Sequence, residues 1–225
     1  CLPETEEAAN FYKRTSSGAP RTIQHEWKPR SHFLTYEEIT RVVRVASGLG
    51  ISKIRLTGGE PLLRRDVPRL VESIAVLPGI EDLALTTNGF LFAKYAQALR
   101  DAGLRRVTFS LDSLETGNFK KMTGRDGLEE LLGAIDLAQQ LGMNPVKVNA
   151  VVIRGLNDHE VPAMAGFARK RGLVMRFIEF MPLDSGRAWQ ADHVVTGREI
   201  LTQLQEAFEL EPLDDEHAAA TAKRW

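Results

Sequence analysis

The segment from Lys53 to Asp66, KIRLTGGEPLLRRD, brings together residue types suited to binding a charged ligand. Alternation along a strand places Lys53, Arg55 and Thr57 on one face, because successive side chains point to opposite sides of a sheet. Cationic side chains on one face can pair with phosphate or carboxylate groups. These side chains must therefore face water, one another or a charged ligand.

A glycine pair and a carboxylate follow this strand, as Gly58, Gly59, Glu60 and Pro61. Glycine carries no β-carbon, so a ligand can approach the backbone of Gly58 and Gly59 closely. Glu60 lies at the carboxyl end of the strand, where parallel α/β sheets bind their ligands. Pro61 fixes the backbone at the exit. A tight strand-to-helix turn with a surface glutamate is the alternative interpretation.

Later strands also end in polar or ligand-type residues. These are Thr86-Thr87-Asn88-Gly89, Ser110 with Asp112, Asn149, and the segment from Glu179 to Met181. Each has a plain structural explanation, such as the turn that Asn-Gly pairs favour. Their repetition at successive strand ends indicates one site along the rim of a barrel-type sheet.

Basic side chains are candidates for binding phosphate groups at this rim. Arg55 and Lys147 are the stronger candidates, because strand alternation points both inward. Arg64 and Arg65 are weaker candidates, because a basic pair in the first turn of a helix is often only solvated. The five histidines show no metal-ligand spacing, so we assign none of them to a metal.

Strands and helices alternate between residues 35 and 208. Thr35 and Glu38 form a capping box that begins a helix ending near Leu49. Expected strands cover residues 53–57, 83–87, 106–111, 146–153 and 174–180, and expected helices cover 67–77, 92–102, 128–141, 159–171 and 197–208. Short connections between such units predict a parallel sheet.

Polar residues recur on one face of these strands, namely Lys53, Arg55, Thr57, Arg106, Thr108, Ser110, Asp112, Lys147 and Asn149. Strands of a sheet covered on both faces are almost continuously apolar. An unpaired buried charge also costs several kcal/mol, on the order of a domain's whole stability. Among α/β folds, the polar face therefore favours a partial (β/α) TIM-like barrel with a hydrated, basic interior over a sheet covered by helices on both faces.

The composition is that of an ordinary globular protein, with 225 residues, 43% hydrophobic residues and a formal net charge of -1. This charge argues against a general nucleic-acid coat or a membrane-surface protein. No apolar run approaches the length of a membrane span. The one cysteine, Cys1, fits a reducing compartment. We therefore expect a cytoplasmic protein with no nucleic-acid partner and no membrane partner.

Several segments resemble the GTP 3′,8-cyclase family of radical S-adenosylmethionine (SAM) enzymes, also called molybdenum cofactor biosynthesis protein A. The segments are Cys1-Leu2-Pro3-Glu4, RLTGGEPLLRRD, Thr86-Thr87-Asn88-Gly89, SLDSL from Ser110, NPVKVNAVVIRGLN from Asn144, and RFIEFMP from Arg176. GGEP alone is typical of the whole radical SAM superfamily. RLTGGEP, VKVN and RFIEFM together indicate this member of it.

The resemblance implies a lyase that converts GTP to 3′,8-cyclo-7,8-dihydro-GTP in the first step of molybdenum cofactor (molybdopterin) biosynthesis. Its cofactors would be a 4Fe-4S cluster, with Cys1 as a metal ligand, and SAM. In this family the reduced cluster cleaves SAM to a radical that takes hydrogen from the ribose of GTP. The implied partners are GTP, a reductant for the cluster and a second copy of the chain in a homodimer.

Site residues can also be assigned from the resemblance. Those implied to bind the cofactor are Gly58, Gly59, Glu60, Pro61, Ser110 and Met181. Those implied to bind GTP are Arg55, Thr86 and Lys147. No catalytic side chain is assigned, because the role of the barrel is to hold both ligands at reacting distance.

The chain also departs from the family pattern, because it contains neither the other two cysteines of a CxxxCxxC loop nor those of a second cluster. We therefore interpret it as truncated at both ends and expect it to be inactive by itself. The expected organisation has a cluster-loop remnant and long loop at 1–34, a partial barrel that binds SAM and GTP at 35–208, and the start of a C-terminal region at 209–225.

Three alternatives stay open. Another radical SAM enzyme would keep GGEP without needing both Arg55 and Lys147. A non-redox phosphate-binding barrel would use Lys147 as a Schiff-base nucleophile. A non-catalytic nucleotide-binding fragment would bind GTP without reducing SAM.

Overall fold

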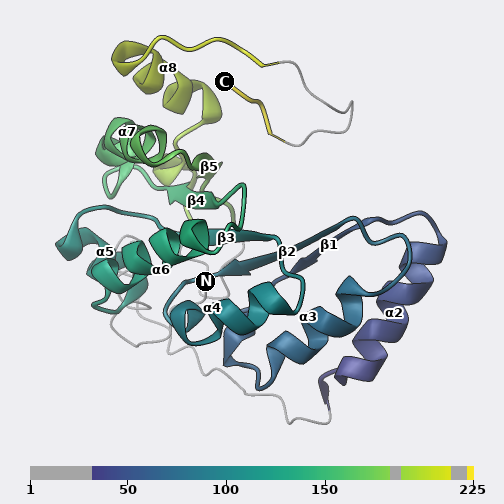
Figure 1. Ribbon diagram of the computed structural model, residues 1–225. Coiled ribbons are helices and arrows are strands. Elements are labelled where there is room, and N and C mark those ends of the chain that lie inside the picture. Colours follow the sequence, from purple (N-terminus) through teal and green to yellow (C-terminus); the bar gives the residue numbers. More distant parts are fainter. Residues whose placement is uncertain (1–31, 183–188, 214–221) are drawn as a thin grey trace.

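A computed structural model describes residues 32–182, 189–213 and 222–225, so Cys1 and most of the expected loop before residue 35 lie outside the described residues. Five parallel strands form one sheet: β1 (Lys53–Leu56), β2 (Asp82–Thr87), β3 (Arg106–Ser110), β4 (Lys147–Val152) and β5 (Val174–Glu179). Their spatial order, β1-β2-β3-β4-β5, follows the chain (Figure 1). A doubly wound sheet reverses direction at a switch point, whereas a barrel wall keeps this order. The predicted partial barrel is confirmed.

The helices of the described chain are α2 (Tyr36–Gly48), α3 (Val67–Ala75), α4 (Phe92–Asp101), α5 (Thr116–Thr123), α6 (Leu128–Gln140), α7 (Val161–Arg171) and α8 (Gly197–Ala207). Short 3-10 turns are η2 (Pro61–Leu63), η3 (Asp158–Glu160) and η4 (Ala191–His193). All the predicted helices are present, with ends displaced by a few residues. The sequence patterns did not predict α5, which has no capping side chain and is only eight residues long.

The start of α2 shows why local sequence predicts it well. Thr35 Oγ1 accepts a hydrogen bond from Glu38 N at 3.2 Å, and Thr35 N donates to Glu38 Oε2 at 2.7 Å. This capping box gives hydrogen-bond acceptors to two backbone N–H groups that would otherwise be unpaired at the start of the helix. Thr196 and Glu199 begin α8 in the same way.

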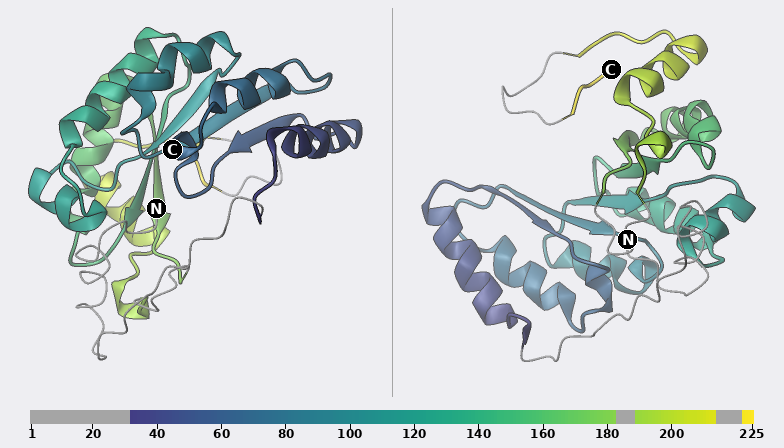
Figure 2. Two further views of the ribbon diagram at one scale, coloured as in Figure 1. Left: turned by 90° about the horizontal axis from the view of Figure 1, so that it is seen from below. Right: turned by 180° about the vertical axis from the view of Figure 1, so that it is seen from behind.

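The core lies between the sheet and the helices packed on its outer face, and Figures 1 and 2 show α3, α4 and α6 together on that side. Buried outer-face residues are Leu83, Leu85, Val107, Phe109, Val148 and Ala150. Phe109 packs edge-on against Phe92 of α4, with ring centroids 5.1 Å apart. Because these alternate residues are buried, the intervening residues of each strand lie on the opposite side, called here the inner face. No helix in the described part of the chain is long and apolar enough to cross a membrane.

Candidate active site

The inner face carries a group of cationic side chains from four of the strands. We call Arg55, Arg106, Lys147 and Arg176 the cation cluster. In the register of the sheet, Ala84 alone separates Arg55 from Arg106. Alanine is small, so it leaves space above the sheet between the two guanidinium groups. Lys147 and Arg176 extend the basic surface across β4 and β5.

Two threonines orient Arg55 within this cluster. Arg55 Nη1 donates to Thr86 Oγ1 at 3.1 Å and to Thr108 Oγ1 at 2.9 Å. Thr108 is also the register partner of Lys147. The three residues expected to bind the substrate, Arg55, Thr86 and Lys147, therefore lie close together on the inner face.

The cations of the cluster disfavour one another's charge. Burial is the largest cause that lowers the pKa of Lys147, and the positive charges of the three arginines lower it further. Burial likewise lowers the pKa of Arg55, with Arg106 and Arg176 adding to the effect. A site that depresses the pKa of its cations gains free energy when an anion binds between them.

Asp82 is the carboxylate that opposes this repulsion. It raises the pKa of both Arg55 and Lys147. Asp82 is itself paired through both oxygens with Arg106, including a 2.6 Å hydrogen bond from Nε to Oδ1. One carboxylate among four cations leaves a local positive excess, although the net charge of the whole chain is -1. The fold concentrates positive charge that composition does not reveal.

Sequence reasoning assigned no binding role to Arg106, Arg176 or Asp82. Alternation places Arg106 two residues before Thr108 on the polar face of β3, whereas Arg176 lies between the apolar residues Val174 and Ile178 on the same face of β5. Asp82 was harder to find. Its contact with Arg106 depends on the register of two strands separated by a helix.

Asn149 occupies the inner face of β4, between Ser110 of β3 and Arg176 of β5. Among the described residues, its Oδ1 is the single buried side-chain nitrogen or oxygen atom without a hydrogen-bond partner. An unpaired buried acceptor costs about 1–3 kcal/mol. A ligand that donates a hydroxyl or an amine to Asn149 would remove this cost.

In the GGEP segment the two glycines are exposed, whereas the glutamate side chain is hydrogen-bonded within the protein. Gly58 and Gly59 are exposed, and a β-carbon on either would meet no atom within 4 Å. The carboxylate of Glu60 is half-buried and is bound by donors of the protein itself. It accepts hydrogen bonds from Leu62 N at 3.0 Å, Thr87 Oγ1 at 2.8 Å and Asn88 N at 2.7 Å. Glu60 thus ties the end of β1 to the end of β2.

The other predicted cofactor-binding residues occupy different parts of the rim. Pro61 begins the 3-10 turn η2. Ser110 ends β3 and is the register partner of Asn149. Met181 follows β5 and is 48% exposed. The predicted metal ligand Cys1 lies outside the described residues.

Arg64 makes its contacts with the segment that begins α2. It donates to Leu34 O at 2.5 Å and stacks over the ring of Tyr36 at 4.4 Å from the centroid. These contacts attach η2 to the start of α2. The weaker candidacy of Arg64 for phosphate binding stays a prediction.

The family of the chain follows from a match to known proteins. Residues 12–168 match the family model described as Radical SAM superfamily. The chain belongs to the radical SAM superfamily. The structure of Streptococcus suis SuiB bound to S-adenosylmethionine is similar in fold, with a TM-score of 0.63 at 17% identity over 82% of this chain and 40% of that one. Methylornithine synthase (PylB) gives a TM-score of 0.62 at 19% identity over 77% of this chain and 53% of that one.

Proteins found by sequence comparison share a much higher identity with this radical SAM chain than these two structures do. It is 49% identical over 198 residues to a GTP 3′,8-cyclase of Acidothermus cellulolyticus, covering 88% of this chain and 55% of the relative. It is 51% identical over 180 residues to one of Syntrophomonas wolfei, covering 80% of this chain and 55% of the relative. The chain therefore spans little more than half the length of these curated relatives.

Proposed function

We propose that this chain is the central part of a GTP 3′,8-cyclase, which converts GTP to 3′,8-cyclo-7,8-dihydro-GTP in molybdenum cofactor biosynthesis. The cation cluster is the observation that carries the proposal, because it supplies a site for a polyphosphate on the inner face of a radical SAM barrel. The identity to the cyclases of Acidothermus and Syntrophomonas supports GTP as the ligand.

The phosphates of GTP would bind between the cationic side chains. Arg55 is held by Thr86 and Thr108 with its guanidinium on the inner face, so its orientation is set before the ligand arrives. Lys147 contributes a point charge that adapts to phosphate position. Binding would relieve the mutual repulsion that lowers the pKa of Lys147.

SAM would bind nearer the carboxyl ends of the strands, and the described residues there fit it. The open backbone at Gly58 and Gly59 permits close approach, and Asn149 Oδ1 offers an unused acceptor for a hydroxyl or amine. Ser110 and Met181 would complete the contacts. Bound SAM supplies the reactive group, whereas the side chains of this chain hold it beside the nucleotide and keep water out.

The 4Fe-4S cluster is a different case. Such clusters are held by several cysteine thiolates, and the sequence contains one cysteine, Cys1. The residues of this chain by themselves therefore do not fit the cluster, and we derive no step through it. We propose that the remaining ligands belong to the full-length protein and that this fragment alone is inactive.

The finer partner assignments also belong to this proposal. The enzyme would need a reductant, and we propose that it acts in the cytoplasm as a homodimer without nucleic-acid or membrane partners. The near-neutral net charge supports the last two points, since nucleic-acid and membrane-surface proteins usually carry a strong basic excess.

Lys147→Ala in the full-length protein tests the substrate assignment. We expect the dissociation constant for GTP to rise by about tenfold to a hundredfold, because hydrogen bonds to charged groups contribute about 1.5–3 kcal/mol. Binding of SAM should be nearly unchanged. Isothermal titration under anaerobic conditions measures both constants. Lys170→Ala is the matched control, because Lys170 is exposed on α7. Equal loss of GTP and SAM binding in Lys147→Ala would contradict the assignment.

The lowered pKa of Lys147 favours one second candidate, a non-redox barrel in which this amine forms a Schiff base with a phosphorylated carbonyl substrate. Borohydride reduction in the presence of small sugar phosphates would trap such an adduct. Mass spectrometry should find no adduct on Lys147 if the cyclase proposal is right, and a trapped adduct would favour the second candidate.

A further inference from the structure

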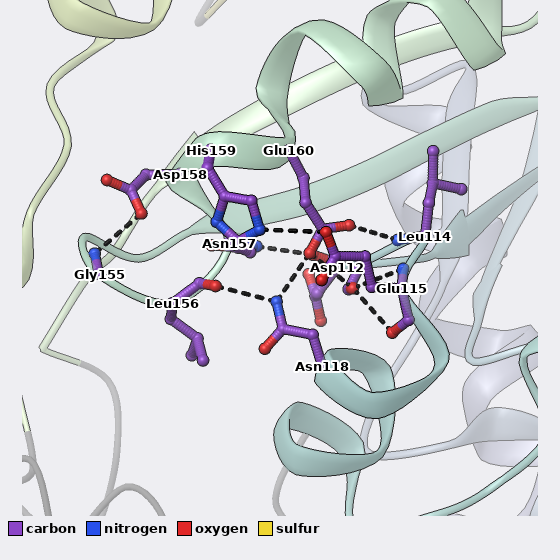
Figure 3. Close-up of polar contacts among 11 residues, drawn as sticks. Asp112, Leu114, Glu115, Asn118, Gly155, Leu156, Asn157, Asp158, His159 and Glu160 are labelled. Atoms are coloured by element: carbon purple, nitrogen blue, oxygen red, sulfur yellow. Dashed lines mark hydrogen bonds and ion pairs between the residues drawn. The ribbon is translucent and has the colours of Figure 1, made fainter.

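The loop that follows β3 is held by a buried carboxylate from a distant part of the chain. Glu160, at the start of α7, is 3% exposed. Its Oε1 accepts hydrogen bonds from Ser113 Oγ and Asn118 Nδ2, both at 2.7 Å, and its Oε2 accepts one from Leu114 N at 2.7 Å (Figure 3). Three donors from the chain after β3 therefore converge on one side chain of the chain after β4.

Asn157 joins the same two segments at a second point. It is 1% exposed, and its Nδ2 donates to Asp112 O at 2.6 Å and to Val151 O at 2.8 Å. Its Oδ1 accepts from Ile153 N at 2.8 Å. Asp112 Oδ1 in turn accepts from Val151 N at 2.8 Å. The loop of residues 112–115 is thus attached on both sides to the segment that leaves β4 (Figure 3).

A polar network is a costly way to obtain stability alone. A buried carboxylate loses its hydration and regains free energy only when its lone pairs meet well-placed donors. Apolar side chains of similar size often stabilise such a position equally well. A fully paired polar network instead specifies one geometry, because each donor must meet its own acceptor. The arrangement around Glu160 therefore fixes where the loop lies.

The position of this loop matters for the site. Ser110 ends β3 only two residues before Asp112, and it lies beside Asn149 on the inner face. The hydrogen bonds of Arg55 run to Thr86 and Thr108 within the strands, so they do not depend on the loop. The loop joins β3 through Leu111, so we infer that a shift of the loop would reach Ser110 before it reached Thr108 and the cation cluster.

We propose that Glu160 is a positioning residue for SAM, acting through Ser113 and Leu114 on the loop that begins after Ser110. This role rests on the proposed function, in which Ser110 contacts SAM and the cation cluster binds GTP. Glu160 touches neither ligand. It sets the geometry of one ligand site and not of the other.

Glu160→Gln in the full-length, cluster-reconstituted protein tests this role. The variant keeps the shape of the side chain but turns an amide N–H₂ toward groups that are themselves donors. Ser113→Ala removes one donor and leaves the carboxylate in place. For each variant we expect the dissociation constant for SAM to rise severalfold, with about tenfold as the upper bound because the lost hydrogen bond lies within the protein, and that for GTP to stay unchanged.

His159→Ala is the matched control. His159 Nε2 lies 3.2 Å from Glu115 Oε1, and both side chains are more than half exposed. This pair is next to Glu160 in the chain but adds no hydrogen bond to the buried network. Its removal should leave the binding of SAM and of GTP unchanged.

The results separate the two proposals. Unchanged SAM binding in Glu160→Gln and Ser113→Ala would overturn the positioning role, as would equal weakening of SAM and GTP binding, which indicates general destabilisation. If Glu160→Gln does not fold, the ratio of SAM to GTP affinity in Ser113→Ala decides alone. A folded wild-type protein that binds neither SAM nor GTP would overturn the proposed function, and the positioning role with it.

Discussion

Lys147 illustrates how neighbouring residues change the chemistry of one side chain. Burial, reinforced by three arginines, lowers the pKa of its ammonium group from the ordinary value of 10.5. In the proposed function the charged form of Lys147 binds phosphate, and this form is lost as pH rises through the lowered pKa. Lys147 therefore loses its proton at a lower pH than an exposed lysine does.

This shift predicts a pH dependence of nucleotide binding. The affinity of the full-length protein for GTP should be constant below the lowered pKa and should fall as pH rises through it, with the fall beginning below pH 10.5. Because bound phosphate stabilises the ammonium, the fall reflects the pKa of the free protein. Titration calorimetry over a series of alkaline buffers measures the profile.

Lys147→Arg provides the control for this profile, because the guanidinium stays charged throughout the range. Its affinity for GTP should not show the same alkaline fall. An identical fall in the wild type and in Lys147→Arg would assign the titration to another group.

At the residue scale, the alternation within single strands correctly predicted which side chains face inward. The pairings between side chains of neighbouring strands depend on strand register and were not predicted. Arg55 and Lys147 were predicted to point inward because each lies on the polar side of its own strand. The pairing of Asp82 with Arg106 depends on two strands and the helix between them. The expected contact of Glu60 with the cofactor stays a prediction, and the three hydrogen bonds that its carboxylate accepts from within the protein were not foreseen.

At the scale of elements, the turn from β2 into α4 depends on Gly89. Its φ angle is +86°, and an added β-carbon would lie 2.3 Å from Leu131 Cδ1. Any other residue would combine backbone strain with a steric clash. Leu131 belongs to the core and is fully buried, so it has little space to move.

Gly89→Ala should therefore lower the free energy of unfolding by about 2–4 kcal/mol, the sum of a strained left-handed residue and an overpacked contact. Urea denaturation of the full-length protein, monitored by circular dichroism, measures the change. Gly133→Ala is the control. Gly133 lies within α6, where an added β-carbon meets no atom within 4 Å. That variant should be neutral or more stable by up to about 1 kcal/mol. Equal effects of the two changes would contradict the role given to Gly89.

Sequence patterns predicted elements well where the signals were local. The capping box at Thr35 and the apolar stripe that follows it located α2 to within a residue. Helix α5 was missed because its stability comes from tertiary contacts. Phe119 and Met122 are buried against the core, and no capping side chain begins the helix.

At the scale of the molecule, the sheet separates two environments. The outer face of the strands packs against helices, and the inner face carries the cation cluster. The overall charge of -1 hides this division, because acidic residues elsewhere balance the cluster. The partial barrel could be predicted because several strands carry polar residues on the same face. The hydrogen bonds around Glu160 could not be predicted, since each of its partners lies 42 to 47 residues before Glu160 in the chain.

The nucleotide dependence of SAM cleavage tests most directly whether this radical SAM chain is part of a GTP cyclase. The full-length protein, reconstituted with its clusters, is incubated anaerobically with SAM and a reductant. Formation of 5′-deoxyadenosine is then quantified with GTP, with ATP and without nucleotide. We predict that GTP strongly increases 5′-deoxyadenosine formation, that ATP does not replace it, and that Lys147→Ala removes the increase at low GTP concentration. Formation that is equal in all three mixtures would contradict the assignment of GTP as the substrate.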